Sequence, residues 1–210
     1  MLRKFLPYGT HALLALCGLM LVIAPMVARA YPEPSIVPRS WSLEFEYQHP
    51  QLIAVEDLNG RTQWFWYIAY KVVNETDREQ LFIPEFHIAT DEGDLITANE
   101  DIPTTVFKAI RKREGNKLME SPVQAIGQLL IGEDHAKESA IIWPVFDHDV
   151  DVVDVFIAGL NGEAQRYTPP GAEEPIIVRK TLMLTYKLPG NPNRIQDMDA
   201  KFHDEDWIMR

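Results

Sequence analysis

Apolar and polar side chains alternate over residues 41–47. The apolar face consists of Trp41, Leu43, Phe45 and Tyr47, and polar residues stand between them. Alternation with a period of two is typical of a half-buried β-strand. We therefore predict a strand here, ended by His49-Pro50, and a second extended segment over residues 51–55.

The strand expected at the centre of the core covers residues 63–73. Its sequence, Gln-Trp-Phe-Trp-Tyr-Ile-Ala-Tyr-Lys-Val-Val, is apolar on both faces, as in a strand covered on both sides. Pro84 indicates an edge or a bulge in a later segment. The remaining strand patterns cover residues 81–89, 95–98, 139–146, 152–159 and 176–188.

Two segments in the middle of the chain have helical spacing instead, residues 103–113 and 122–130. A proline lies in the first turn of each, and Asp101 or Ser121 precedes it as a candidate cap. We expect two short helices, or one helix and a loop, inserted among the strands.

About eight strands at this spacing are typical of an all-β sandwich. We predict a mainly β fold, with an immunoglobulin-like β-sandwich over residues 31–190 and a short helical insertion near residues 103–130. Residues 191–210 are expected to form an acidic C-terminal tail, mobile unless Trp207 and Ile208 dock on the body.

The first thirty residues carry an export pattern. A basic start is followed by an apolar run over residues 12–27 and by Ala28-Arg29-Ala30, which fits the small-x-small pattern before a cleavage site. The run is shorter than the roughly 20 residues that a spanning helix needs. We predict a signal peptide over residues 1–30, cleaved before Tyr31, with no stable membrane span afterwards; an uncleaved membrane anchor is the alternative.

Cys17 is the only cysteine of the 210 residues. Lipidation at Cys17 is disfavoured because Leu16 stands where a small residue is expected. Cleavage would leave about 180 residues without disulfides or a thiol nucleophile, so the domain must be stabilised by its core. An exported domain of this kind indicates a bacterial cell envelope, with the protein in the periplasm or outside the cell.

The whole chain has a net charge of −11 at pH 7. Arg3, Lys4 and Arg29 are the only charged residues of the first thirty, so the remainder carries −14. Such a charge disfavours nucleic acid and anionic lipid surfaces as partners. An envelope protein or a polysaccharide is compatible with it, and the pattern leaves the oligomeric state open.

Several short segments between about Gly132 and Pro189 resemble the landmarks of one family. They are Glu133-Asp134, Ala140-Ile141-Ile142-Trp143, Ile157-Ala158-Gly159-Leu160-Asn161, Pro169-Pro170-Gly171-Ala172 and Arg179-Lys180-Thr181-Leu182. These segments resemble uncharacterised exported proteins of planctomycete-type bacteria. The resemblance implies an origin and an envelope location, and it transfers no activity and no catalytic residue.

Asp147, Asp149 and Asp151 alternate along the chain and are candidate oxygen ligands for a hard cation. An EF-hand loop requires Gly at its sixth position and Glu at its twelfth, where this chain has Val152 and Ala158. A polar hairpin tip explains the segment better than a metal site. The histidines are scattered without the spacing of a zinc site, and no cofactor is predicted.

Trp64 and Trp66 are candidate ligand-binding residues, because they fall on one face of the central strand and flat aromatic rings stack against sugars. The alternative, which we favour, is that one face of this strand is core and the helical insertion covers the other.

Two further motifs have structural explanations. Arg111-Lys112-Arg113 ends a predicted helix, where cations interact favourably with the helix dipole. Asn74-Glu75-Thr76 matches a glycosylation sequon, which we treat as chance in a bacterial protein.

The sequence therefore predicts a protein that is not an enzyme. No serine has the Gly-x-Ser-x-Gly setting of one class of hydrolase, and a catalytic carboxylate pair cannot be chosen from sequence. The first hypothesis is a non-catalytic exported structural or protein-interaction module of the cell envelope. A carbohydrate-binding β-sandwich with exposed aromatics is the alternative, and a metal-dependent or carboxylate-based hydrolase ranks third.

Overall fold

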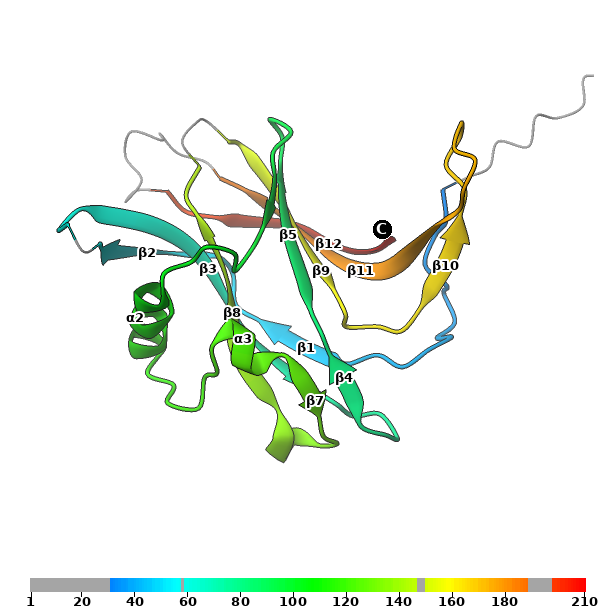
Figure 1. Ribbon diagram of the computed structural model, residues 1–210, viewed down its shortest axis with the longest axis horizontal. Helices are drawn as coiled ribbons and strands as arrows, with labels where there is room; N and C mark the ends of the chain where they lie inside the picture. Colours follow the sequence, from blue (N-terminus) through cyan, green and yellow to red (C-terminus); the bar gives the residue numbers. More distant parts are fainter. Residues whose placement is uncertain (1–30, 58, 147–149, 189–197) are drawn as a thin grey trace, which may run out of the picture. The chain divides into compact units, whose positions relative to one another are not determined.

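The computed structural model describes residues 31–57, 59–146, 150–188 and 198–210, so the expected signal peptide lies outside the described residues. Residues Pro32–Arg210 form one compact unit (Figure 1). This unit is built mainly from antiparallel strands, which confirms the prediction of a mainly β fold. No helix in the described ranges is long and apolar enough to cross a bilayer.

The first sheet has β3 at its centre. Its members are β1 (Glu44–Tyr47), β2 (Gln51–Glu56), β3 (Thr62–Val73) and β8 (Lys137–Pro144). β8 pairs with one edge of β3, whereas β1 and β2 pair end to end with the other. Pro50 and a one-residue change of register separate β1 from β2, as the break at this proline predicts.

The second sheet has the strand order β6-β5-β9-β11-β12. Its members are β5 (Glu85–Thr90), β6 (Leu95–Thr97), β9 (Val152–Ala158), β10 (Ala164–Tyr167), β11 (Ile176–Lys187) and β12 (Lys201–Met209). β10 continues β9 along the same edge of β11 after an interruption. If β1 and β2 are counted as one strand, and β9 and β10 as another, the two sheets contain eight strands. The eight segments of the pattern differ, because they count residues 41–47 and 51–55 separately and do not include β12.

The two sheets share one hydrophobic core. Trp66, Ile68 and Tyr70 of β3 alternate toward it, because successive side chains of a strand point to opposite faces. From the second sheet the core receives Val155 of β9 and Leu184 of β11. This arrangement is sandwich-like, and the long apolar runs of the sequence supply its interior.

Helix α2 (Thr104–Glu114) covers the other face of the first sheet. Phe65 and Tyr67 of β3 point to this side and pack with Val106 and Ile110 of the helix. β3 is therefore buried on both faces, the arrangement that the two-sided apolar pattern of residues 63–73 indicates.

The second expected helix is shorter than the sequence predicts. α3 spans only Pro122–Ala125, and residues Gly127–Leu129 form strand β7. Ile126 is extended and Gly127 has φ 135°, a value that side chains disfavour and that ends the helix. β7 pairs with β4 (Gln80–Phe82) in a small two-stranded sheet.

Pro84 separates β4 from β5, so these two strands belong to different sheets. Gly159 at the end of β9 passes close to this junction. A Cβ atom on Gly159 would lie 2.5 Å from the carbonyl oxygen of Ile83, and φ is 86°. The chain can therefore pass here only without a side chain.

The C-terminal segment differs from the expected acidic tail. Residues Lys201–Met209 form β12, which pairs with β11 along its whole length. Trp207 packs against the core, and Met209 is 1% exposed. Trp207 thus docks on the body, because the β11–β12 ladder places it opposite Leu182.

Candidate binding site

The candidate metal ligands are not assembled in the described residues. Asp147 and Asp149 lie outside those residues, and Asp151 is exposed at the start of β9, where its backbone oxygen accepts a hydrogen bond from Leu188. Among the described residues, no group of three or more acidic, histidine or cysteine side chains could hold a metal ion.

The two candidate tryptophans have different surroundings. Trp66 is 1% exposed and lies in the core between the sheets, opposite Trp143 of β8. A sugar ring has no access to Trp66 in this position, so its ring serves packing. Trp64 is half-buried near the beginning of β3 and lines an open groove.

Loop 99–103, between β6 and α2, forms one wall of two neighbouring hollows. Asn99 and Asp101 have positive φ values of 67° and 53°, and no other non-glycine residue of the described chain does. Asn99 is fixed to the edge of β8: its N–H donates to the oxygen of Ile142 (2.8 Å), and its Oδ1 accepts from the N–H of Ile142 (2.9 Å). The loop is thus held in a conformation that Asn and Asp tolerate.

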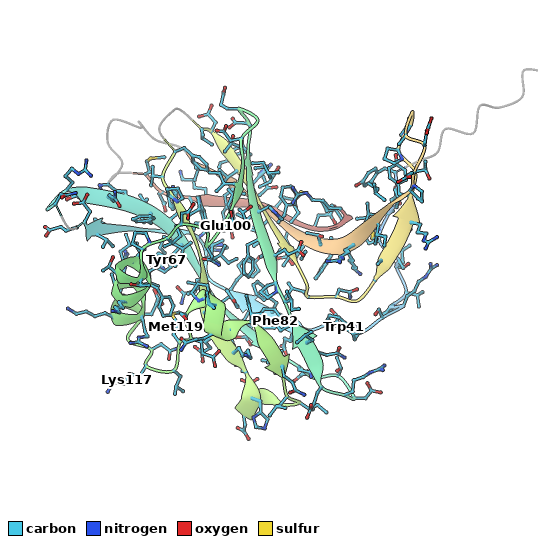
Figure 2. All side chains as sticks on the ribbon, in the orientation of Figure 1. Trp41, Tyr67, Phe82, Glu100, Lys117 and Met119 are labelled. Atoms are coloured by element: carbon cyan, nitrogen blue, oxygen red, sulfur yellow. The ribbon has the colours of Figure 1, made fainter. Side chains whose placement is uncertain are left out.

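The first hollow, which we call the Trp64 groove, has a volume of about 560 Å³. Its residues come from β3, from loop 99–103 and from the segment after β8. They are Thr62, Gln63, Trp64, Phe65, Glu100, Asp101, Ile102, Pro103, Pro144, Val145 and Phe146. Figure 2 shows Glu100 on the loop above the helix. Among these lining residues, the aromatic ring of Trp64 is of a kind that stacks on a sugar ring, and the carboxylates of Glu100 and Asp101 and the amide of Gln63 are of a kind that accepts bonds from its hydroxyls.

The second hollow, the α2–α3 pocket, has a volume of about 320 Å³. Its apolar lining is Ile102, Pro103, Phe107, Pro122, Val123 and Ile142, and its polar lining is Asn99, Thr104, Lys108, Arg111, Ser121 and Gln124. No acidic residue lines it. Since the Trp64 groove carries Glu100 and Asp101, loop 99–103 separates an acidic hollow from a basic one.

A third hollow lies at the C-terminal end of α2 and is lined by Glu46, Glu114 and Glu138. The hydroxyl of Tyr67 donates to Oε1 of Glu114 (2.7 Å), while Asn116 donates to Glu138. Burial, and then this bond to Glu114, raise the pKa of Tyr67. Figure 2 shows Tyr67 on the side of β3 that faces α2. Two of the three carboxylates are thus engaged in holding the helix and its connection to the sheet.

The sequon asparagine, Asn74, is fully buried at the end of β3. Its Nδ2 donates to the oxygens of Arg78 (2.9 Å) and Leu129 (3.0 Å), and its Oδ1 accepts from the N–H and the hydroxyl of Thr76 (3.0 and 2.7 Å). Both polar atoms of this side chain are engaged: they hold the turn after β3, and the bond to Leu129 joins this turn to β7. The amide is therefore part of the fold and is inaccessible to a modifying enzyme.

The basic cluster is divided between two roles. All three residues lie in the last turn of α2, as the sequence predicts. Arg113 donates to the backbone oxygen of Leu52 and lies over the ring of Tyr67, 5.9 Å from its centre. Arg111 lines the α2–α3 pocket instead, which the helix-dipole explanation does not anticipate.

Sequence reasoning did not identify Asn99, Lys108 and Gln124 as residues of one site. The signal for Asn99 is the cluster Asn99-Glu100-Asp101 before Pro103, because Asn and Asp tolerate left-handed backbone. Lys108 and Gln124 carried no signal, since only the tertiary fold places both of them on the lining of one hollow.

Comparisons of the chain with protein-family models, with curated proteins and with solved structures give no match. The resemblance to exported planctomycete-type proteins therefore stays a prediction.

Proposed function

We propose that the protein is an exported, non-catalytic interaction module of the bacterial cell envelope, which binds a partner protein through the insertion between β6 and β8. The observation that carries this proposal is the exposed apolar surface of the insertion. Leu118 is 82% exposed and Val123 is 80% exposed, although the chain as a whole has a net charge of −11. Val123 also borders a hollow whose wall includes Phe107 and Ile142, and an apolar groove that opens to the surface is typical of a contact site.

The proposed scaffold is an immunoglobulin-like sandwich, and the strand order supports it. Such a fold places strands A, B and E in one sheet and C, F and G in the other. Here the first strand (β1 with β2), the second (β3) and the fifth (β8) form one sheet. The third (β5), the sixth (β9 with β10) and the seventh (β11) are neighbours in the other. The fourth strand, β6, extends the second sheet beside the third, and β12 adds an eighth strand at the opposite edge.

Export is tested by the intact mass of the protein recovered from the envelope fraction. A mass that begins at Tyr31 supports cleavage of residues 1–30, whereas the full-length mass contradicts it and favours the membrane anchor.

The contact surface is tested with single cysteines, because the chain from Tyr31 onward contains none. Val123→Cys is labelled with a benzophenone maleimide and irradiated in an envelope extract. Leu95→Cys on β6 is the matched control, since Leu95 is also exposed. We expect a discrete adduct from position 123 that is missing from position 95. The same products from both positions, or no adduct from position 123, would contradict the proposal.

A second candidate function is carbohydrate binding in the Trp64 groove. It is favoured by the lining of this groove, which includes the half-buried Trp64 and the acidic residues Glu100 and Asp101. Isothermal titration with a panel of polysaccharides tests it: Trp64→Ala should weaken binding about tenfold or more, the loss of one stacking contact and its buried area. Phe202→Ala, at an exposed aromatic of β12, should leave binding unchanged. Equal polysaccharide affinities of the two variants would contradict carbohydrate binding in this groove.

A further inference from the structure

The side-chain amides of the α2–α3 pocket have their oxygens engaged and their nitrogens free. Oδ1 of Asn99 accepts the N–H of Ile142 (2.9 Å). Oε1 of Gln124 accepts the N–H and the hydroxyl of Ser121 (3.2 and 2.7 Å). A backbone N–H can bond only to an acceptor, so both amides are oriented with their NH₂ groups unused. In the described part of the chain neither NH₂ group has a bonded acceptor.

The charged groups of the pocket are also donors. Lys108 and Arg111 stand three residues apart on α2 and therefore lie on one face of the helix. Both are exposed, and among the described residues neither has an ion pair or a hydrogen bond. No acidic side chain lines the pocket, although the chain as a whole has a net charge of −11. Amides and cations together thus present donors to anything that enters.

The rest of the lining is apolar and the space is small. Phe107 and Ile142 are buried below it, and Pro122 forms part of the wall beside them. A volume of about 320 Å³ is at the lower end of the range for small-ligand pockets. The pocket therefore has room for one apolar side chain with its carboxylate rather than for a long acyl chain or a sugar chain.

We propose that the α2–α3 pocket binds the C-terminal residue of a partner polypeptide, with the terminal carboxylate at Lys108 and Arg111 and an apolar side chain against Phe107 and Ile142. The donors stand on three separate elements: loop 99–103, α2 and α3. A free fatty acid offers acceptors at one end only. A peptide C-terminus offers the carboxylate and the preceding backbone carbonyls, which match donors on several walls.

This inference rests on the proposed function, because Val123 of the contact surface also lines the pocket. It adds the chemistry of the partner: a free carboxyl end with an apolar last residue.

The test is fluorescence polarisation with labelled hexapeptides, randomised except for a terminal Leu or Phe and a free carboxylate. The same library with an amidated C-terminus should bind about tenfold more weakly or worse, as expected for losing one charge-assisted contact. Arg111→Glu should weaken binding of the free-acid library by a similar factor. Lys112→Glu is the matched control, since it makes the same charge change on the same helix and Lys112 does not line the pocket.

The proposal is overturned by equal binding of acid and amide libraries, by equal effects of the two glutamate variants, or by no peptide binding at millimolar concentration. Sodium octanoate competing more strongly than the peptides would assign the pocket to free acids and also overturn it. Thermal melting of both variants checks that they fold. If no peptide binds while labelled Val123→Cys still forms its adduct, the pocket proposal fails and the proposed contact surface stands.

Discussion

At the scale of single residues, hydrogen-bonded polar side chains decide how the loops are held. Asn99 holds loop 99–103 to β8, and Asn74 joins the end of β3 to β7. The Asn74 side chain donates and accepts at the same time, whereas Asn99 accepts through its side chain and donates through its backbone N–H. Neither role follows from the residue type, since asparagine in a turn is most often exposed to water.

Asn74→Ala should lower the free energy of unfolding by about 2–3 kcal/mol, because it removes the side-chain partners of the backbone oxygen of Leu129 and the N–H of Thr76. Urea denaturation followed by tryptophan fluorescence measures the change. Glu75→Ala, at the exposed neighbouring position, should stay within about 0.5 kcal/mol of the unsubstituted protein. Equal stability of both variants would show that the buried network of Asn74 is not formed.

At the scale of elements, β12 shows how pairing overrides composition. Its residues His203, Asp204, Glu205 and Asp206 are exposed and, read alone, indicate a solvated tail. Main-chain pairing with β11 does not depend on side-chain polarity, and Met209 supplies an apolar anchor at the end. Charged side chains on an edge strand also discourage pairing with other chains.

Met209→Ala should destabilise the protein by about 2–5 kcal/mol, the cost of removing a buried methionine side chain from a packed site. Chemical denaturation measures it. Asp204→Ala, in the same strand but exposed, should change stability by no more than about 0.5 kcal/mol. If Met209→Ala also has no effect, β12 is not docked and the tail prediction is right.

At the scale of the whole molecule, single contacts join parts that are far apart in sequence. The hydroxyl of Tyr47 on β1 donates to Glu205 on β12 (2.5 Å), which links the two sheets. Burial, and then this bond, raise the pKa of Tyr47. Glu163, before β10, accepts the N–H of Ser35 (3.0 Å) and so holds the segment that leads into the first sheet.

Stability should depend on the ionisation of Glu163. Hydrogen bonds from Ser35 hold the pKa of this carboxyl below its ordinary value of 4.5, against the opposing effect of burial. A carboxyl whose pKa is lower in the folded state stabilises the protein above the unfolded pKa, and this contribution is lost as pH falls through the folded pKa.

Glu163→Gln should therefore lower the melting temperature at pH 7, and its difference from the unsubstituted protein should narrow between about pH 5 and about pH 3. Glu33→Gln is the control, since among the described residues the bond to Glu33 is made to its backbone oxygen and not to its carboxylate. A difference that is constant with pH would show that the charge of Glu163 contributes nothing.

The sequence by itself determined the class of the fold and the position of its centre. The two-sided apolar pattern of residues 63–73 predicted the strand that both the second sheet and α2 cover, because burial on both faces requires apolar residues on both. The prolines at positions 50 and 84 marked real interruptions, since proline lacks the N–H that a ladder needs.

Only the tertiary structure decided which strands are neighbours and which side chains meet in a pocket. It also decided that the acidic C-terminal segment forms a strand, although its composition indicates a solvated tail. Trp64 and Trp66 have the same residue type and the same strand face, yet one lines a groove and the other fills the core. Lys108, Asn99 and Gln124 are brought together by contacts between distant segments. Local patterns record the period of an element, whereas a site depends on long-range packing that no local pattern contains.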